Sequence, residues 1–348
     1  MLSAMSSTAS SAVAVVFCAA IATFSAMACA GLIVLIRPWL QRYALARPNV
    51  RSSHTVPTPQ GGGIAVVAAT FGASYGASFL LAPGAVSAAP PAMLVAAIIV
   101  MAGVGAAADI HPIDVAPRLL LQMLAVAAVI YVLPVELRVV PVLPWWTERI
   151  LLVIGGVWFV NLVNFMDGLD WMTAAEVVPI TAALASIGLL GLLPPRAVVI
   201  SLALCGAMIG FAYFNRPVAK LFLGDVGSLP IGLVLCWLLV LLAGSGGRAA
   251  ALLLPLYYLA DSTITLLRRL GKGEQIWQAH RSHFYQRATD RGFTVIDVVG
   301  RVFVVNLVLA ALALMTVILP SHAIDIAALI AGAAAVGWLL FAFAHGRI

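Results

Sequence analysis

Long apolar stretches alternate with short polar segments along the whole chain. A helix that spans a bilayer needs about 20 predominantly apolar residues, and the apolar positions run continuously here, unlike the alternating strands of a membrane barrel. The pattern predicts an all-α, polytopic integral membrane protein with about 11 transmembrane helices in one domain, residues 1–348. The predicted stretches are 11–36, 62–82, 91–108, 119–134, 149–163, 174–194, 197–214, 228–243, 248–267, 299–319 and 323–344.

Composition narrows the class of protein further. Hydrophobic residues make up 63% of the chain and charged residues 9%, whereas a soluble domain is about one quarter charged. A disordered chain is also excluded, because it needs low hydrophobicity and high net charge. The four cysteines lie in apolar stretches without the spacing of a metal site, which indicates buried apolar side chains. The net charge of +6 indicates contact with lipid headgroups, and we expect no nucleic-acid partner.

The basic residues predict the orientation in the membrane. No Lys or Arg precedes the first apolar stretch and several arginines follow it, so we do not interpret this stretch as a cleavable signal peptide. With 11 crossings and the N-terminus outside, 15 of the 19 basic residues fall in cytoplasmic segments, as the positive-inside rule requires. The remaining four fall outside: Arg138, Arg149, Arg196 and Arg248. We therefore expect a multi-pass protein of the inner (plasma) membrane.

Acidic residues gather on the same side as the basic ones. Ionisable groups at membrane depth are costly and tend to be functional. Eight acids fall in predicted cytoplasmic segments or at helix ends that face them: Asp109, Asp114, Asp167, Asp170, Asp225, Glu274, Asp290 and Asp297. Their gathering at separate sequence positions predicts an active site at the cytoplasmic face.

The first predicted cytoplasmic loop, residues 47–63, contains three prolines and ends in three consecutive glycines. Prolines stiffen a loop, and glycines let the backbone approach a ligand closely. Next to the N-terminus of the following helix, this pattern suits a phosphate group. A rigid connector explains the same pattern equally well.

The loop after the fifth stretch carries Asn164, Asp167 and Asp170 at a spacing of three residues. If the segment is helical, this spacing places the three side chains on one face. Carboxylates and an amide at the membrane surface suit Mg²⁺ or the ribose and base edge of a nucleotide. A helix N-cap would account for one aspartate but not for the whole set, so we favour the functional interpretation.

The loop after the seventh stretch ends in Asp225, which lies between Gly224 and Gly227 at a predicted helix start. A carboxylate there suits a metal ion that bridges phosphates, with Lys220 as a positive charge for phosphate and Phe222 as a surface for a base. An N-cap is the alternative role for this aspartate.

The long segment after the ninth stretch carries His280 and His283 together with Arg281 and Arg287. These side chains suit a pyrophosphate or a sugar. A zinc site is less favoured, because no cysteine or third histidine lies nearby. Asp261 lies about two turns before a basic pair, so a snorkelling ion pair and a functional role remain equal alternatives for it.

These segments in this order resemble the polyprenyl-phosphate N-acetylhexosamine-1-phosphate transferase family, of the glycosyltransferase family 4 type. The family includes the phospho-MurNAc-pentapeptide transferase of peptidoglycan synthesis. The sequences of these motifs are most similar to those of the branch that starts O-antigen synthesis, and the similarity covers residues 47–292. The shared motifs are RSSH at 51–54, PTP at 57–59, GGG at 61–63, NFMDG at 164–168 and HRSHFYQR at 280–287.

The resemblance implies an enzyme that transfers N-acetylhexosamine 1-phosphate from a UDP-sugar to undecaprenyl or another polyprenyl phosphate and releases UMP. It implies Mg²⁺, with Mn²⁺ as an alternative, bound by Asp225 and Asn164. It implies catalytic roles for Asp109, Asp167, Asp170 and Asp225. The implied substrate-binding residues are His54, Asn164, Gly168, Asn215, Lys220, Phe222, His280, Arg281 and His283. The implied partners are the UDP-N-acetylhexosamine donor, polyprenyl phosphate and membrane lipid, with a homodimer left open.

Three positions depart from the family pattern. Ala108 precedes Asp109 where the family carries a pair of aspartates, so one acid near the lipid phosphate is missing. Trp171 stands where the family usually has glycine, and Gln60 replaces a residue that is commonly basic. Two alternatives therefore stay open beside the enzyme. One is a transporter or flippase for a lipid-linked sugar, and the other is a weakly active or non-catalytic relative that binds the lipid.

Overall fold

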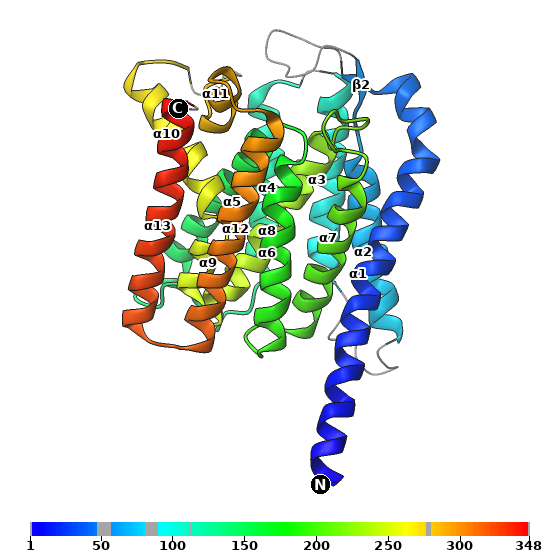
Figure 1. Ribbon diagram of the computed structural model, residues 1–348, viewed down its shortest axis with the longest axis vertical. Coiled ribbons are helices and arrows are strands. Elements are labelled where there is room, and N and C mark those ends of the chain that lie inside the picture. The colour runs from blue at the N-terminus through cyan, green and yellow to red at the C-terminus, as the bar shows by residue number, and fades with distance from the viewer. Residues whose placement is uncertain (1, 47–56, 81–89, 112, 276–279, 347–348) are drawn as a thin grey trace.

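The structure is a computed structural model that describes residues 2–46, 57–80, 90–111, 113–275 and 280–346. Apart from one ladder of two short strands, its regular elements are helices, which confirms the predicted all-α class. In chain order the elements are α1 (Leu2–Tyr43), β1 (Leu45–Ala46), β2 (Thr58–Pro59), α2 (Gly63–Leu80), α3 (Ala92–Ile110), α4 (Val115–Tyr131), α5 (Trp145–Met166), α6 (Met172–Leu189), α7 (Pro195–Ala212), α8 (Asp225–Gly244), α9 (Arg248–Leu253), α10 (Leu256–Gly271), α11 (Phe284–Asp290), α12 (Val295–Ile318) and α13 (His322–His345). Figure 1 shows a bundle of long helices, from which the N-terminal part of α1 projects.

The helices of the described residues agree with a protein that crosses the membrane many times. Nine of them are long and apolar enough to span a bilayer. Each of the eleven predicted apolar stretches overlaps a helix, but α4 has only 17 residues. The ninth predicted stretch is divided into α9 and α10, with Pro255 at the N-cap of α10. Proline lacks the backbone N–H that would continue the helical hydrogen bonds, which accounts for a break at this position.

Helix α8 forms the centre of the bundle, with nearly all of its residues buried. It packs against α2, α3 and α5. Its N-terminal turn is approached so closely that only glycine fits: a Cβ on Gly63 would lie 2.1 Å from the Cα of Gly227, and one on Gly105 would lie 2.3 Å from the carbonyl oxygen of Asp225. Small residues allow helices to approach in this way. The contacts bring the start of α2 and the end of α3 to the start of α8.

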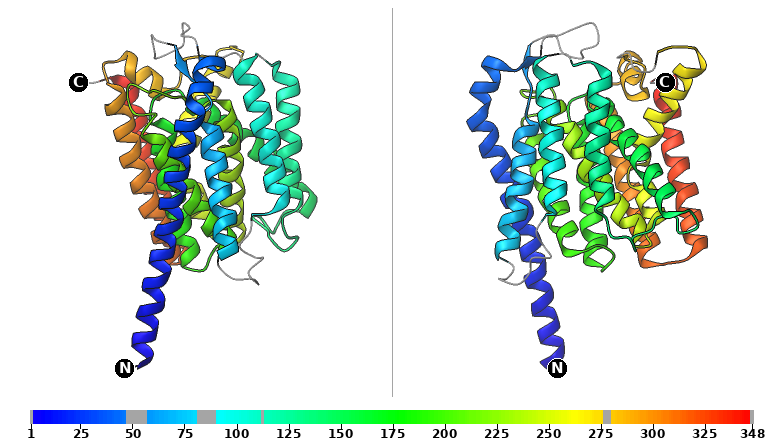
Figure 2. Two further views of the ribbon diagram at one scale, coloured as in Figure 1. Left: turned by 90° about the vertical axis from the view of Figure 1, so that its right-hand side faces the viewer. Right: turned by 180° about the vertical axis from the view of Figure 1, so that it is seen from behind.

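The segments that carry the predicted site lie at one end of the bundle. Figures 1 and 2 show β2, α11 and the end of α13 at the same end of the bundle, opposite the N-terminal part of α1. The connections from α3 to α4, from α5 to α6 and from α7 to α8 lie at this end as well. That this end faces the cytoplasm stays a prediction, as do the helix count and the single domain.

Candidate active site

Asp109, in the last turn of α3, binds the beginning of α8. Its Oδ1 accepts the backbone N–H of Asp225 at 3.0 Å, and its Oδ2 accepts that of Val226 at 3.1 Å. The first N–H groups of a helix have no partner within the helix, so the carboxylate satisfies two of them. Gly224 has a φ of +76°, and a Cβ on it would lie 2.6 Å from Asp109 Oδ2. The carboxylate therefore acts as a side-chain cap supplied from another helix.

Asp225 itself is held between α4 and α5. Its Oδ2 lies 2.9 Å from the Arg118 guanidinium, and its Oδ1 accepts the Asn164 amide N–H at 2.7 Å. Arg118 also donates to the amide oxygen of Asn164 at 3.0 Å, and the Asn164 amide donates to Ser228 at 2.8 Å. Each carboxylate oxygen of Asp225 thus has a donor, while about a quarter of the side chain stays exposed.

Arg118 also belongs to this cluster, although it lies in none of the predicted motifs. From the sequence it is one of the 15 basic residues of the predicted cytoplasmic side. Its position in the first turn of α4, four residues after Asp114 and in an otherwise uncharged helix, is the signal for it in the sequence. Its ion pair and its hydrogen bond now place it beside two predicted site residues.

Asp167 and Asp170 have different surroundings although they are three residues apart. Asp167 accepts a hydrogen bond from the Thr173 hydroxyl group. Burial, together with the negative charges of Asp225, Asp109 and Asp170, raises the pKa of Asp167 to about 7, although the hydrogen bond from Thr173 lowers it. Asp170 is buried, and its Oδ2 accepts the backbone N–H of Ala219 at 2.9 Å. Asp167 therefore belongs to the carboxylate cluster, whereas Asp170 fastens the loop that precedes α8.

Asn215 fastens the same loop. Its side-chain oxygen accepts the backbone N–H of Trp171 at 2.7 Å, and its amide donates to the Leu221 carbonyl group at 3.0 Å. The side chain is buried. Lys220 is exposed in this loop, while Phe222 is half-buried. Of the loop residues predicted to contact substrate, Lys220 and Phe222 are therefore the more accessible ones.

Backbone pairing joins the first loop to the segment before α8. The N–H of Gly62 donates to the Phe222 carbonyl group, and the N–H of Phe222 donates to the Pro59 carbonyl group, both at 2.9 Å. Gln60 adds a side-chain hydrogen bond to the Asp109 carbonyl oxygen at 2.6 Å. His54 lies outside the described residues, so its predicted role stays a prediction.

Asp261 organises the histidine segment from within α10. The side chain is fully buried. Its Oδ1 lies 3.2 Å from His283 Nδ1 and accepts the Phe284 N–H at 3.0 Å, and its Oδ2 accepts the Tyr285 N–H at 3.1 Å. Arg268, its alternative partner in a snorkelling ion pair, lies over the Phe284 ring instead. Asp261 therefore holds the start of α11.

The histidine segment reaches the Asp167 loop through Tyr285. The Tyr285 hydroxyl group donates to the Phe165 carbonyl group at 3.0 Å, and a Cβ on Gly168 would lie 2.1 Å from that hydroxyl oxygen. His283 is buried, and the His280 ring stacks on it at 4.9 Å between ring centroids. Gly168 thus leaves room for Tyr285, and His280 is the more accessible histidine.

Arg281 is occupied by neighbours in its own segment. Its guanidinium lies 3.3 Å from the Asp290 carboxylate and 3.2 Å from the Thr289 hydroxyl oxygen. The predicted contact of Arg281 with a phosphate or a sugar stays a prediction, and it requires an exchange of these partners.

Comparisons with known proteins identify the family of the chain. The sequence profile of glycosyl transferase family 4 matches residues 91–243. Decaprenyl-phosphate N-acetylglucosaminephosphotransferase of Mycobacterium tuberculosis is 31% identical over 285 residues, 72% of this chain and 70% of the relative. The chain belongs to glycosyl transferase family 4.

Two further family members extend the comparison. A probable undecaprenyl-phosphate N-acetylglucosaminyl 1-phosphate transferase of Bacillus subtilis is 25% identical over 79% of this chain and 80% of its own length. A phospho-N-acetylmuramoyl-pentapeptide-transferase of Limosilactobacillus reuteri is 28% identical over 50% of this chain and 54% of its own length. The resemblance inferred from the motifs is therefore confirmed.

The structure gives physical reasons for two departures from the family pattern. Trp171 has a φ of +65°, a left-handed conformation that glycine adopts at little cost. The indole N–H of Trp171 donates to the Ala212 carbonyl group at 2.6 Å, which holds the larger residue in place. The Gln60 side chain donates a hydrogen bond to the Asp109 carbonyl group. It therefore joins the first loop to α3, although it lacks the positive charge of the residue that is common in the family.

The side-chain oxygens of Asp225 and Asn164 are of the kind that bind a hard divalent cation such as Mg²⁺. Among the described residues, no three His, Cys, Asp or Glu side chains form a metal site. Mg²⁺, however, needs only one or two protein carboxylates when substrate phosphates supply further oxygens. Asp225 supplies such a carboxylate and is partly exposed, and a metal ion there would replace Arg118 or Asn164 as the partner of one of its oxygens. The amide oxygen of Asn164 faces Arg118, so Asn164 as a metal ligand stays a prediction.

Proposed function

We propose that this family member transfers N-acetylhexosamine 1-phosphate from a UDP-sugar to polyprenyl phosphate. The observation that carries the proposal is the position of Asp225 at the start of α8, between Arg118 and Asn164 and next to the Asp109 cap. The relatives named as polyprenyl-phosphate N-acetylglucosamine phosphotransferases support it.

The reaction exchanges one phosphoryl bond for another. An oxygen of polyprenyl phosphate attacks the β-phosphorus of the donor, the bond from that phosphorus to the bridging oxygen breaks, and UMP leaves with the electron pair. Negative charge must be stabilised throughout such a transfer. Arg118 lies beside Asp225 to balance charge there, and exposed Lys220 supplies a second cation for a phosphate.

A magnesium ion at Asp225 would neutralise the pyrophosphate of the donor. The residues around it have separate tasks. Asp109 holds the N-terminus of α8, and with it the backbone of Asp225. Asp170 and Asn215 hold the loop that presents Lys220 and Phe222. Asp167, whose pKa of about 7 allows both protonation states near neutral pH, is suited to accept a proton from the attacking phosphate.

The product would be a lipid-linked pyrophosphoryl sugar that begins a cell-surface polysaccharide of the O-antigen type. We place the active end of the bundle at the cytoplasmic face of the plasma membrane, because 15 of the 19 basic residues fall on the predicted cytoplasmic side.

The test is UMP release by the purified full chain with polyprenyl phosphate, Mg²⁺ and a panel of UDP-N-acetylhexosamines. Release that depends on both substrates, and that is lost in Asp225→Asn, would support the proposal. Binding of polyprenyl phosphate without release of UMP would favour the non-catalytic alternative, for which Ala108 is the motivating observation. Movement of a preformed lipid-linked sugar across vesicles, without UMP release, would favour a flippase.

A further inference from the structure

Glu176 carries a carboxyl group that neither the predicted motifs nor the proposed reaction uses. It lies in the second turn of α6, a candidate membrane span, and is 1% exposed. An ionisable side chain at this depth is costly and is normally paired. Among the described residues it forms no ion pair with a lysine, an arginine or a histidine. The titratable groups that interact with it from α10 are the neutral hydroxyl groups of Tyr257 and Tyr258. Its burial therefore needs a neutral partner.

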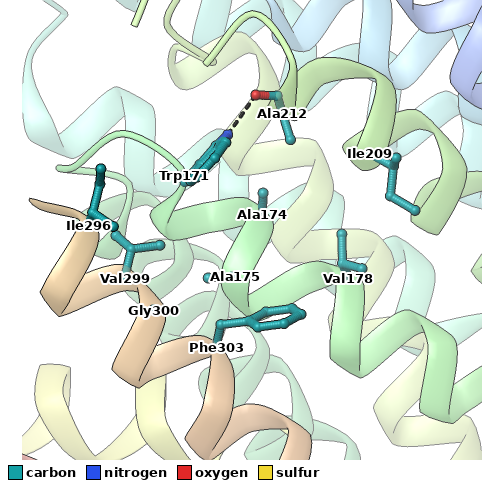
Figure 3. A pocket seen from close by; sticks show the side chains of 10 residues that line it. All are labelled: Trp171, Ala174, Ala175, Val178, Ile209, Ala212, Ile296, Val299, Gly300 and Phe303. Carbon is teal, nitrogen blue, oxygen red and sulfur yellow. Dashed lines mark hydrogen bonds between the residues drawn. The ribbon is translucent and has the colours of Figure 1, made fainter. Parts of the chain in front are cut away.

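Asn306 of α12 is that partner. Its amide group donates to Glu176 Oε2 at 2.6 Å and to the Ala175 carbonyl oxygen at 3.0 Å. Asn306 is as deeply buried as Glu176. Figure 3 shows α6 and α12 side by side, with Ala175 of α6 close to Val299 and Phe303 of α12, one to two turns before Asn306. Polar side chains hydrogen-bond across membrane helices in this way, so the two amide hydrogens join α12 to α6.

The bond to Ala175 fills a gap that Pro179 leaves in α6. In an α-helix the carbonyl group of Ala175 would accept the N–H of the residue four positions further on, which is Pro179. Proline has no backbone N–H, so this carbonyl group has no such partner within its own helix. At membrane depth a freed backbone group must be satisfied by a neighbouring element. Asn306 supplies that donor from α12.

Two oxygens of the pair have no hydrogen-bond partner within the described part of the chain. They are Glu176 Oε1 and Asn306 Oδ1, and both are buried. Both are acceptors while the carboxyl group is ionised, so neither can satisfy the other. A proton on Glu176 makes Oε1 a donor, for which Asn306 Oδ1 is an acceptor on the same partner. A neutral acid and an amide can thus exchange two hydrogen bonds, whereas the ionised pair leaves two buried acceptors unsatisfied at a cost.

The pair lies one turn from the contact that α6 makes with the carboxylate cluster. Thr173, three residues before Glu176, is buried, and its hydroxyl group donates to Asp167. Residues three apart lie on the same face of a helix. The Glu176 carboxyl group also faces the backbone N–H of Tyr258, in the first turn of α10. Glu176 therefore acts on Asp167 through the position of Thr173.

We propose that Glu176 is a positioning residue. It remains protonated, exchanges two hydrogen bonds with Asn306, and so holds α6 against α12 with the Thr173 hydroxyl group on Asp167. The protonation and the pairing do not depend on the reaction that the protein performs. The effect on turnover rests on the proposed function, in which Asp167 accepts a proton from the attacking phosphate.

Infrared difference spectroscopy of the full chain in nanodiscs tests the protonation. At neutral pH, the spectrum of the wild type minus that of Glu176→Gln should contain the carbonyl band of one protonated carboxylic acid. The band should shift in Asn306→Leu, which removes both hydrogen bonds of the pair. Carboxylate bands in place of the acid band would overturn the proposal. No substrate is present, so this result stands apart from any failure of the wild type to release UMP.

Turnover tests the positioning. The side chain of the Glu176→Gln variant can also accept from Asn306 and donate to it, so kcat should stay within about twofold of the wild type. Glu176→Leu removes both bonds, and its kcat for UMP release should decrease about tenfold at nearly unchanged KM for the UDP-sugar, the size of one hydrogen bond to a charged group. Thr181→Val is the matched control, because this buried side chain of α6 donates to the Val177 carbonyl group of its own helix, and kcat should not change.

A second change separates positioning from a loss of stability. Thr173→Val removes the hydroxyl group that bonds to Asp167, so Glu176→Leu should lower kcat little further in this background. Asn306→Leu gives the same comparison if Glu176→Leu does not fold. Additive losses, or a loss in Glu176→Gln as large as in Glu176→Leu, would overturn the positioning role. So would a Glu176→Leu variant with a lower unfolding temperature and an unchanged kcat.

Discussion

The carboxylate of Asp109 accepts the backbone N–H of Asp225 at 3.0 Å, although 116 residues separate the two in the chain. The aspartate that the family resemblance assigns to the lipid phosphate thus also caps the helix that begins with the predicted metal ligand. A change at Asp109 therefore acts on the position of Asp225 as well as on any chemistry of its own.

Asp109→Asn should lower the turnover of polyprenyl phosphate by roughly 10²–10⁴-fold, the loss expected for a general base. The amide NH₂ group cannot accept one of the two backbone N–H groups, so the unfolding temperature should decrease as well. Ala108→Asp should change the rate little, because Asp109 already occupies the cap. Full activity of Asp109→Asn, or a clear gain in Ala108→Asp, would contradict this assignment.

Asp225→Asn should abolish transfer while the protein remains folded in the membrane. The charge that balances Arg118 and suits Mg²⁺ is lost, which removes several kcal/mol of stabilisation from the transferring phosphate. UMP release at limiting and saturating Mg²⁺ measures the effect. Asp297→Asn is the matched control, because Asp297 also lies in the first turn of a helix but belongs to a capping box with Thr294. Turnover near that of the wild type at limiting Mg²⁺ would refute the role of Asp225.

Asp167 should make the protein less stable as the pH rises. Its pKa in the folded protein is raised to about 7, above the value of about 4 in an unfolded chain. Below pH 4 both states are protonated, and between pH 4 and 7 the unfolded state loses its proton first, so folding is increasingly penalised. Above pH 7 the penalty stays constant.

Unfolding temperatures of the wild type and Asp167→Asn, measured with EDTA from pH 4.5 to 8.5, test this prediction for Asp167. The stability of the variant relative to the wild type should increase up to about pH 7 and then level off. A difference independent of pH would show that the carboxyl group of Asp167 titrates normally.

Asp261→Asn should loosen the histidine segment. The variant retains one acceptor oxygen for the two N–H groups at the start of α11, and it loses the charge that faces His283. Hydrogen exchange in residues 283–290 should become faster, and UMP release should decrease. Asp325→Asn, in the first turn of α13, is the control. Unchanged exchange in α11 would show that the other contacts of the segment suffice.

The orientation can be tested with an impermeant thiol reagent on intact cells. Val142→Cys places a thiol at a residue 87% exposed between α4 and α5, and Lys272→Cys places one at the exposed C-cap of α10. The thiol of the Val142→Cys variant should react from outside, whereas that of the Lys272→Cys variant should react only after lysis. The reverse result would place the carboxylate cluster outside the cell.

The sequence by itself determined the class of the protein, most of its helices and its family. These features depend on local properties: an apolar stretch must satisfy its own backbone hydrogen bonds in lipid, so its length and composition predict a helix. The order of the motifs identified the family for the same reason, since each motif is continuous in the chain. The division of the ninth stretch at Pro255 is not visible in the apolar pattern, because an apolar composition continues across the break.

Only the tertiary structure decided what each polar residue of the site contacts. A carboxylate can cap a helix, pair with an arginine or stay accessible to a ligand, and its neighbours in space select among these roles. Asp170 accepts the backbone N–H of Ala219 in the loop before α8, and Asp261 accepts that of Phe284 at the start of α11. Both carboxylates therefore fix a segment of backbone. Arg118 on α4 meets Asp225 at the start of α8, far away along the chain. No local pattern encodes such pairs, because they depend on how closely α3, α4 and α5 pack around α8.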